Sequence, residues 1–161
     1  MVSMPTPNVS LRRVEVIESR NIIEGVRPSS GWADDFPSKG DLAAMLMYQV
    51  PLEPNEPWSA QWLIIVDDIV SGTIGFKGAP VASKVEIGYG VVPSRQRRGV
   101  ATTALTQLLA LIAGRSLDVL AETATWNEAS QAVLRHAGFE QTGLRRDVDE
   151  SELLIWRRHV A

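Results

Sequence analysis

A basic turn near the middle of the chain has the residue types that bind a negatively charged group. An apolar, strand-like run from Val85 to Val92 is followed by Pro93 and then by Ser94-Arg95-Gln96-Arg97-Arg98-Gly99, just before an amphipathic stretch. Backbone N–H groups at a helix N-terminus lack intrahelical acceptors, and the helix dipole adds partial positive charge there. Glycine at position 99 and alanine at position 101 leave room for an anion, and the arginines add charged donors. The turn therefore predicts a phosphate site, and a diphosphate suits it best.

Other interpretations of this turn stay open from the residues alone. Short glycine patterns are weak signals, so the segment also fits a plain polar connection before a helix. No Gly-Lys-Ser/Thr follows, as a Walker loop requires, and the three-glycine dinucleotide fingerprint is missing. A phosphate-binding module for some other nucleotide is the alternative from a different functional class.

The elements that must position the turn follow from hydrophobic periodicity and turn residues. An Asp67-Asp68 turn between two apolar runs predicts a hairpin, Asp41 is the expected cap of its helix, and Gly138 closes the last one. The predicted strands cover residues 11–17, 61–66, 69–77, 84–92, 117–124, 139–144 and 152–157, and the predicted helices cover 19–25, 41–50, 98–113 and 127–137. Residues 27–40 and 51–57 are expected to be loops, and residues 1–8 to fray. This order predicts a single α/β domain over residues 1–161, with a mixed sheet and helices on its faces.

Composition narrows the possible functions. The chain has 161 residues, 45% of them hydrophobic, which is enough for one domain with a real core. A net charge of −3 gives no reason to expect nucleic acid or an anionic membrane, and no apolar run has the length of a membrane span. There is no cysteine, and His136 and His159 lack ligand-like spacing. We therefore expect a cytoplasmic protein that uses no metal.

Two segments of the sequence resemble one enzyme superfamily. Gln96-Arg97-Arg98-Gly99-Val100-Ala101 is similar to the Gln/Arg-x-x-Gly-x-Gly/Ala signature of the GCN5-related N-acetyltransferase (GNAT) superfamily. The stretch from Ala121 to Phe139, with its Asn127-x-x-Ser130 spacing and the Gly138-Phe139 pair, resembles the branch that acetylates the N-termini of ribosomal proteins. Together the similar segments cover residues 85–144. The resemblance implies a GNAT fold, in which a mostly antiparallel central sheet has a splayed strand pair that binds an acyl-CoA.

The resemblance also implies how acetyl-CoA, as co-substrate, would be held. The amides after Gln96 would bind the diphosphate, and exposed backbone of Val91 and Val92 would pair with the pantetheine arm. An N–H group of either valine could polarise the thioester carbonyl. Asn127 would contact the pantetheine arm, and it is also a favoured helix N-cap, which does not exclude the contact. The implied donor-binding residues are Val91, Val92, Gln96, Arg97, Arg98, Gly99, Val100, Ala101, Thr102, Asn127 and Ser130.

For the proton transfers, the resemblance points to two catalytic side chains. Glu86 stands where relatives keep a catalytic glutamate, and it would accept the proton of the attacking amine directly or through water. A solvated or salt-bridged glutamate is the alternative interpretation, and Glu122 on the next strand is the rival base.

The acid is less clear, because Leu134 occupies the position at which many members of the superfamily have a tyrosine. The two tyrosines of the chain, Tyr48 and Tyr89, do not fit that motif. Ser130 is then the candidate for hydrogen-bonding the sulfur, in a positioning role while solvent supplies the proton.

The acceptor site is expected in the segment between the first strand and the hairpin. Trp32, Asp34 and Asp35 combine aromatic and acidic side chains that suit a cationic amine, with Glu122 as a further candidate. The alternative is that the acids face water and the tryptophans pack as core. The sequence predicts an N-acetyltransferase for a small-molecule or peptide amine, in which the amine attacks the thioester directly in a ternary complex. A non-catalytic acyl-CoA-binding or regulatory domain is the second hypothesis, and a homodimer is common among relatives.

Overall fold

The computed structural model describes residues 2–47 and 54–161 of the chain. In this part, helices and strands follow the predicted order, with two short 3₁₀ turns added. The strands are β1 (Val9–Arg13), β2 (Gln61–Val66), β3 (Ile69–Phe76), β4 (Lys84–Val91), β5 (Leu117–Ala124), β6 (Glu140–Arg146) and β7 (Glu152–Val160). The helices are α1 (Val16–Glu24), α2 (Lys39–Met47), α3 (Val100–Ala110) and α4 (Glu128–His136), and the 3₁₀ turns are η1 (Pro57–Ser59) and η2 (Pro93–Arg95).

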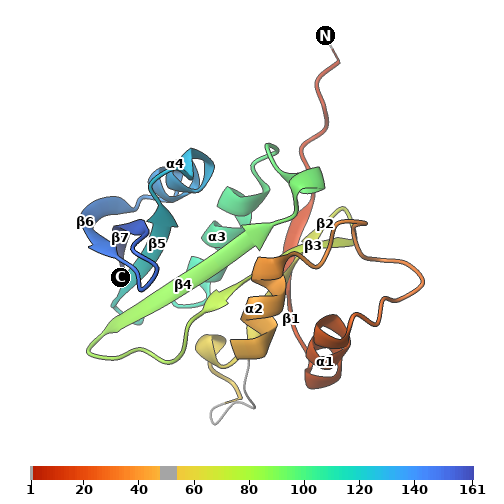
Figure 1. Cartoon of the computed structure of the whole chain (residues 1–161), viewed down its shortest axis with the longest axis horizontal. Helices are drawn as coiled ribbons and strands as arrows, with labels where there is room; N and C mark the ends of the chain where they lie inside the picture. Colours follow the sequence, from red (N-terminus) through yellow and green to blue (C-terminus); the bar gives the residue numbers. More distant parts are fainter. Residues whose placement is uncertain (1, 48–53) are drawn as a thin grey trace.

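The strands form one seven-stranded sheet in the order β1-β2-β3-β4-β5-β7-β6. Every neighbouring pair is antiparallel except β4 and β5, which are parallel. Figure 1 shows α3 and α2 on opposite sides of β4, and β5 running away from β4 toward α4. The prediction of a mixed, mostly antiparallel sheet with helices on its faces is therefore confirmed. No helix in residues 2–47 and 54–161 has the length and apolar character needed to cross a membrane.

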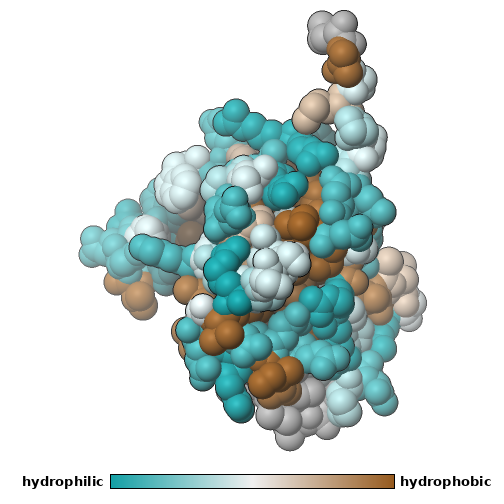
Figure 2. Space-filling model, turned by 90° about the vertical axis from the view of Figure 1, so that its right-hand side faces the viewer, coloured by the Kyte–Doolittle hydropathy of each residue, from teal (hydrophilic) through white to brown (hydrophobic). Residues whose placement is uncertain are grey.

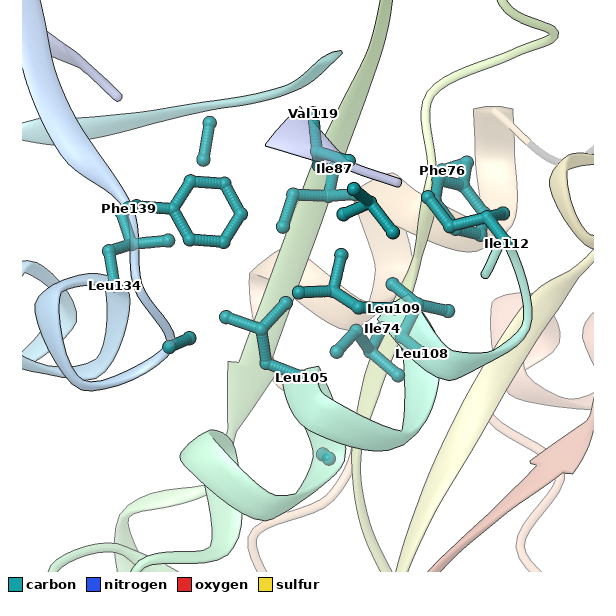
Figure 3. Close-up of a cluster of buried hydrophobic side chains, with 14 of the residues drawn as sticks. Ile74, Phe76, Ile87, Leu105, Leu108, Leu109, Ile112, Val119, Leu134 and Phe139 are labelled. Carbon is teal, nitrogen blue, oxygen red and sulfur yellow. The ribbon is translucent and has the colours of Figure 1, made fainter. Parts of the chain in front are cut away.

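The larger core lies between the sheet and α3. Apolar residues of α3 recur every three or four positions, so they share one side of the helix and meet the strands. Figure 3 shows this set of side chains, which comprises Leu105, Leu108, Leu109 and Ile112 against Ile74, Phe76, Ile87 and Val119. Leu134 and Phe139 complete the cluster from the other side, and both are buried. The position that many relatives fill with tyrosine is thus a core position in this chain.

Alternation along β4 decides which of its residues face the site. Val85 and Ile87 are buried in the α3 core, so the odd-numbered residues of β4 point to that face. Val92 and Met45 instead belong to a second buried cluster, on the face covered by α1 and α2. Glu86, Gly88 and Gly90 therefore face the α2 side of the sheet.

Figure 2 shows the surface from the right-hand side of Figure 1 as mostly hydrophilic, with small hydrophobic patches.

The hairpin of β2 and β3 was predicted correctly, including its turn. Asp67 and Asp68 have φ angles of 48° and 67°. Two consecutive residues with positive φ are typical of the tight turns that match the twist of antiparallel strands. The strands end within one residue of their predicted bounds.

The start of α2 and the boundary between β1 and α1 differ from the prediction. Ser38, and not Asp41, caps α2: the backbone N–H of Asp41 donates to Ser38 Oγ (3.2 Å), and the N–H of Ser38 donates to Asp41 Oδ2 (2.7 Å). This reciprocal pair is a capping box. The strand predicted over residues 11–17 is also shorter, because Val16 already begins α1. Residues 48–50 of the predicted second helix and residues 51–53 of the predicted loop lie outside the described residues.

Candidate active site

The turn after β4 presents a set of backbone N–H donors without protein acceptors. Arg97 (φ 63°) and Gly99 (φ 73°) both adopt the left-handed conformation, which directs the chain into α3. The hydrogen bonds of α3 begin with Thr103 N–H, which donates to the Gly99 carbonyl at 3.1 Å. The N–H groups of residues 97–102 have no acceptor in the part of the chain that the structure describes. Unpartnered donors at a helix N-terminus are suited to binding an anion.

Side chains around this turn fix its shape and its charge. The Gln96 amide Nε2 donates to the Val91 carbonyl at 2.7 Å, which ties the turn to the end of β4. Arg98 lies 3.5 Å from Asp67 of the hairpin, Arg97 is exposed, and the Val100 side chain is buried. Val100 therefore contributes only its backbone N–H to the site. The predicted donor-binding residues 96–102 are thus brought together.

Beside the turn, β4 and β5 separate. Their pairing ends at Glu86 and Leu120, although both strands continue. The ladder with β3 shows which β4 groups remain free: Glu86 carbonyl accepts from Lys77 N–H, and Val92 N–H donates to Ser71 carbonyl. In an antiparallel ladder alternate residues bond to the partner strand, so the even-numbered residues point their backbone toward β3. The backbone groups of Tyr89 and Val91 then point into the gap.

This geometry corrects one predicted contact. The N–H group of Val92 donates to the Ser71 carbonyl at 2.9 Å, and its side chain is buried, so Val92 cannot offer that N–H to a bound thioester. The register instead directs the N–H of Val91 and the backbone groups of Tyr89 away from β3, while the Val91 carbonyl accepts from Gln96. This register is compatible with the predicted role of Val91 and leaves the N–H of Val92 bonded to β3.

Across the gap, α4 presents Ser130. Asn127 Oδ1 accepts the N–H of Ser130 at 3.1 Å, so Asn127 is the N-cap of α4. The hydroxyl of Tyr89, on β4, lies 2.8 Å from Ser130 Oγ. Burial, opposed in part by the hydrogen bond to Ser130, raises the pKa of Tyr89 above its ordinary value. The tyrosine and the serine thus come together where the two strands diverge.

The two candidate bases differ in their partners. Lys77 Nζ donates to Glu86 Oε1 at 2.7 Å, and Glu86 keeps 35% of its side chain exposed. Glu122 is bound at both oxygens by Arg145, at 2.7 Å each. The hydrogen bond from Arg145 is the main reason that the pKa of Glu122 lies below its usual value. Glu86 therefore keeps one oxygen without a hydrogen bond to the described residues, and Glu122 does not.

A pocket of about 240 Å³ opens between α2 and strands β3 and β4. Small residues dominate its walls, among them Ala43, Ala44, Gly88 and Gly90, and Lys77 and Tyr89 also line it. Because Gly88 and Gly90 lack side chains, the backbone of β4 forms part of the wall. Glu86 lies on the same face of β4, two residues before Gly88.

The acceptor residues predicted from the loop lie elsewhere. None of Trp32, Asp34 and Asp35 lines this pocket. Trp32 packs edge-to-face on Phe36, with 5.1 Å between ring centroids, and Asp34 is exposed. Asp35 accepts hydrogen bonds from Ser94 N–H (2.9 Å) and Oγ (2.6 Å), which lower its pKa. The loop acid thus anchors the start of the basic turn.

Sequence reasoning missed Tyr89 and Lys77. Tyr89 lies outside the family motif, but its odd-numbered position in a strand whose odd-numbered residues are apolar indicates that it faces α3 and α4. Lys77, directly after β3, pairs with Glu86 of β4. The predicted hairpin contains Lys77 but not Glu86, so it did not indicate this pair.

Comparisons with solved structures show the same fold in known acetyltransferases. A ribosomal L7/L12 α-N-protein acetyltransferase in complex with coenzyme A is 23% identical, with a TM-score of 0.58 over 63% of this chain and 62% of that one. The ribosomal-protein-S18-alanine N-acetyltransferase of Escherichia coli is 15% identical, with a TM-score of 0.65 over 96% and 95%. A spermidine N-acetyltransferase chimera from Vibrio cholerae and hSSAT is 14% identical, with a TM-score of 0.65 over 94% and 95%. The chain thus spans less than two thirds of the first of these relatives.

Sequence comparison extends the result from fold to family. No curated protein matches the chain. A family model described as acetyltransferase (GNAT) domain matches residues 29–140, which include α2, the hairpin, the basic turn, α3 and α4. The match covers more than half of the chain and contains the separated strands and the N-terminal amides of α3. The chain belongs to the GNAT acetyltransferase family.

Proposed function

We propose that the protein transfers an acetyl group from acetyl-CoA to a primary amine, which attacks the thioester directly in a ternary complex. The observation that carries this proposal is the set of unpartnered N–H groups at residues 97–102, next to the gap between β4 and β5. The N–H groups provide donors for a diphosphate, and the gap provides free strand backbone for an extended, amide-containing arm. Acetyl-CoA has both groups. When bound, it supplies the activated acyl group.

Residues of the chain then stabilise the developing charge and accept the proton of the amine. Val91 N–H is the free strand donor that could stabilise negative charge on the carbonyl oxygen, in place of Val92. Glu86 takes up the amine proton through water, because its carboxylate is part-exposed and one oxygen is free of protein partners. We prefer it to Glu122, since Arg145 occupies both oxygens of that side chain.

The acceptor enters through the pocket beside α2 in this proposal. The fold is compatible with a small-molecule amine and with a peptide amine. The relatives named above act on ribosomal proteins and on spermidine. A cytoplasmic location, a reaction without a metal and a homodimer stay part of the proposal, whereas Trp32, Asp34 and Asp35 do not, because none of them lines this pocket.

Filling the pocket should weaken acceptor binding alone. A Cβ built on Gly90 meets no atom within 4 Å, and valine is favoured in strands, so Gly90→Val should fold normally. Its side chain should raise the acceptor KM by about 10-fold or more, since a steric overlap costs about 1–3 kcal/mol. Gly143→Val, in β6 and away from the pocket, is the matched control. An unchanged acceptor KM in Gly90→Val would place the acceptor elsewhere.

Ser130→Ala should lower kcat and leave donor binding nearly unchanged. Alanine suits the first turn of α4 and removes only the hydroxyl. A hydrogen bond to a developing thiolate contributes about 1.5–3 kcal/mol, which corresponds to a loss of about 10- to 100-fold in kcat. Steady-state kinetics with varied acetyl-CoA measure it. A loss in donor binding alone would make Ser130 a contact residue.

The reaction itself is tested by release of free thiol from acetyl-CoA with a panel of amines, which includes amino acids, polyamines and peptide N-termini. Amine-dependent thiol release is the expected result. Binding of coenzyme A without turnover for any amine would favour the non-catalytic acyl-CoA-binding domain. Calorimetry that shows tighter binding of ATP or NAD than of coenzyme A would favour a site for another nucleotide.

A further inference from the structure

The hydroxyl of Tyr89 bridges the gap between the separated strands. It belongs to β4, whereas Ser130 belongs to α4, which follows β5. The phenolic oxygen lies 2.8 Å from Ser130 Oγ and 3.2 Å from the Ser130 carbonyl oxygen. The ring packs against the core beside α3, and the hydroxyl contacts Ser130, so both ends of the side chain have partners.

The helix around Ser130 indicates which way this hydrogen bond runs. In an α-helix each carbonyl accepts the N–H four residues later, so the Ser130 carbonyl already has Leu134 as its donor. Ser130 Oγ, which is also the nearer of the two oxygens, is therefore the better acceptor for the phenolic proton. With Oγ accepting from Tyr89, the serine proton is free to point toward a third group. The raised pKa of Tyr89, due mainly to burial, keeps the phenol protonated and able to donate near neutral pH.

We propose that Tyr89 is the positioning residue for Ser130: its phenol donates to Ser130 Oγ and turns the serine proton toward the sulfur of the acyl donor. This inference rests on the proposed function. When the amine has formed its bond to the acyl carbon, the C–S bond breaks and its electron pair stays on sulfur. The serine hydrogen bond stabilises this thiolate, solvent supplies the proton that makes the free thiol, and the proton of the amine leaves toward Glu86.

Kinetics of three variants test the arrangement. Tyr89→Phe keeps the ring in the core and removes only the hydroxyl, so the melting temperature should stay close to that of the wild type. We expect kcat to fall about 5- to 10-fold, the size of one hydrogen bond, with donor KM unchanged. Because Tyr89 acts only through the serine, Tyr89→Phe in the Ser130→Ala background should cause no further loss. Full additivity of the two losses, or an unchanged kcat in Tyr89→Phe, overturns the inference.

A binding experiment separates this inference from the proposed function. Wild type should bind coenzyme A about 5-fold more tightly than desulfo-coenzyme A, since only the former offers a sulfur to the serine. Tyr89→Phe and Ser130→Ala should both lose this preference and keep their affinity for desulfo-coenzyme A. If the wild type shows the preference and no amine is acetylated, the proposed function fails and the hydroxyl pair stands. If the wild type acetylates amines and Tyr89→Phe still binds coenzyme A more tightly than desulfo-coenzyme A, the proposed role of Tyr89 is wrong. A wild type that binds neither compound overturns both.

Discussion

Gly99→Glu should reduce the affinity for coenzyme A by at least about 100-fold while the protein stays folded. The new carboxylate stands at the N-terminus of α3, where it can accept the N–H groups that would otherwise meet the diphosphate, and it repels that group. At least two charge-assisted hydrogen bonds are lost at about 1.5–3 kcal/mol each, which gives about 10²- to 10⁴-fold. Calorimetric titration with coenzyme A measures the loss.

The structure explains why the fold should survive this change. A Cβ on Gly99 meets no atom within 4 Å, so only the left-handed backbone at φ 73° disfavours the substitution, by about 1–2 kcal/mol. Gly114→Glu is the matched control. Gly114 lies beyond the other end of α3, also has a positive φ (84°) and also has open space at its Cβ. It should show the same modest loss of thermal stability and unchanged affinity. Equal affinities of the two variants would contradict the anion site.

Glu86→Gln should lower kcat/KM for the amine by about 10²- to 10⁴-fold, the usual contribution of a positioned general base. Glutamine has nearly the same size and keeps an oxygen that can accept from Lys77, so the ion pair becomes a hydrogen bond from the charged ammonium to a neutral amide. The pair is half-exposed, with 40% and 35% of the two side chains accessible, so its loss should change the free energy of unfolding by less than about 1 kcal/mol. Affinity for coenzyme A should not change. Steady-state kinetics with varied amine, together with thermal unfolding, measure these effects.

Glu122→Gln is the control that distinguishes the two carboxylates. The paired Arg145 holds the pKa of Glu122 below its ordinary value, so this carboxylate is a weak proton acceptor. Replacing this carboxylate should therefore reduce kcat/KM by less than 10-fold, because a weak base contributes little to general base catalysis. A larger loss in Glu122→Gln than in Glu86→Gln would reverse the assignment of the base.

Much of the fold could be predicted because local signals and tertiary structure agree. The hairpin has two apolar runs joined by an Asp67-Asp68 turn, and β5 alternates strictly between buried and part-exposed positions, so both were predicted almost to the residue. The prediction failed at Val16, where a β-branched run looked like a continuing strand. Pairing of β1 with β2 ends at Arg13 and Trp62, and the chain turns into a helix that packs on α2. Tertiary contacts override propensity there.

The site was predictable only as far as it is local in sequence. The signature at residues 96–101 and the Asn127-x-x-Ser130 cap can each be recognised in a short segment. The contact between Tyr89 and Ser130 cannot, because it depends on how α4 packs against β4, and the two residues are 41 positions apart in the chain. The choice between Val91 and Val92 depends on which residues of β4 bond to β3, a parity that the sequence of one strand does not determine.

The central claim is that the amides of residues 97–102 bind a diphosphate, and a crystal structure of the wild-type protein with coenzyme A tests it most directly. We predict diphosphate oxygens within hydrogen-bonding distance of these N–H groups and the pantetheine arm between β4 and β5. A complex in which this turn contacts solvent alone, with the diphosphate bound elsewhere, would contradict the account and leave only the fold and the family.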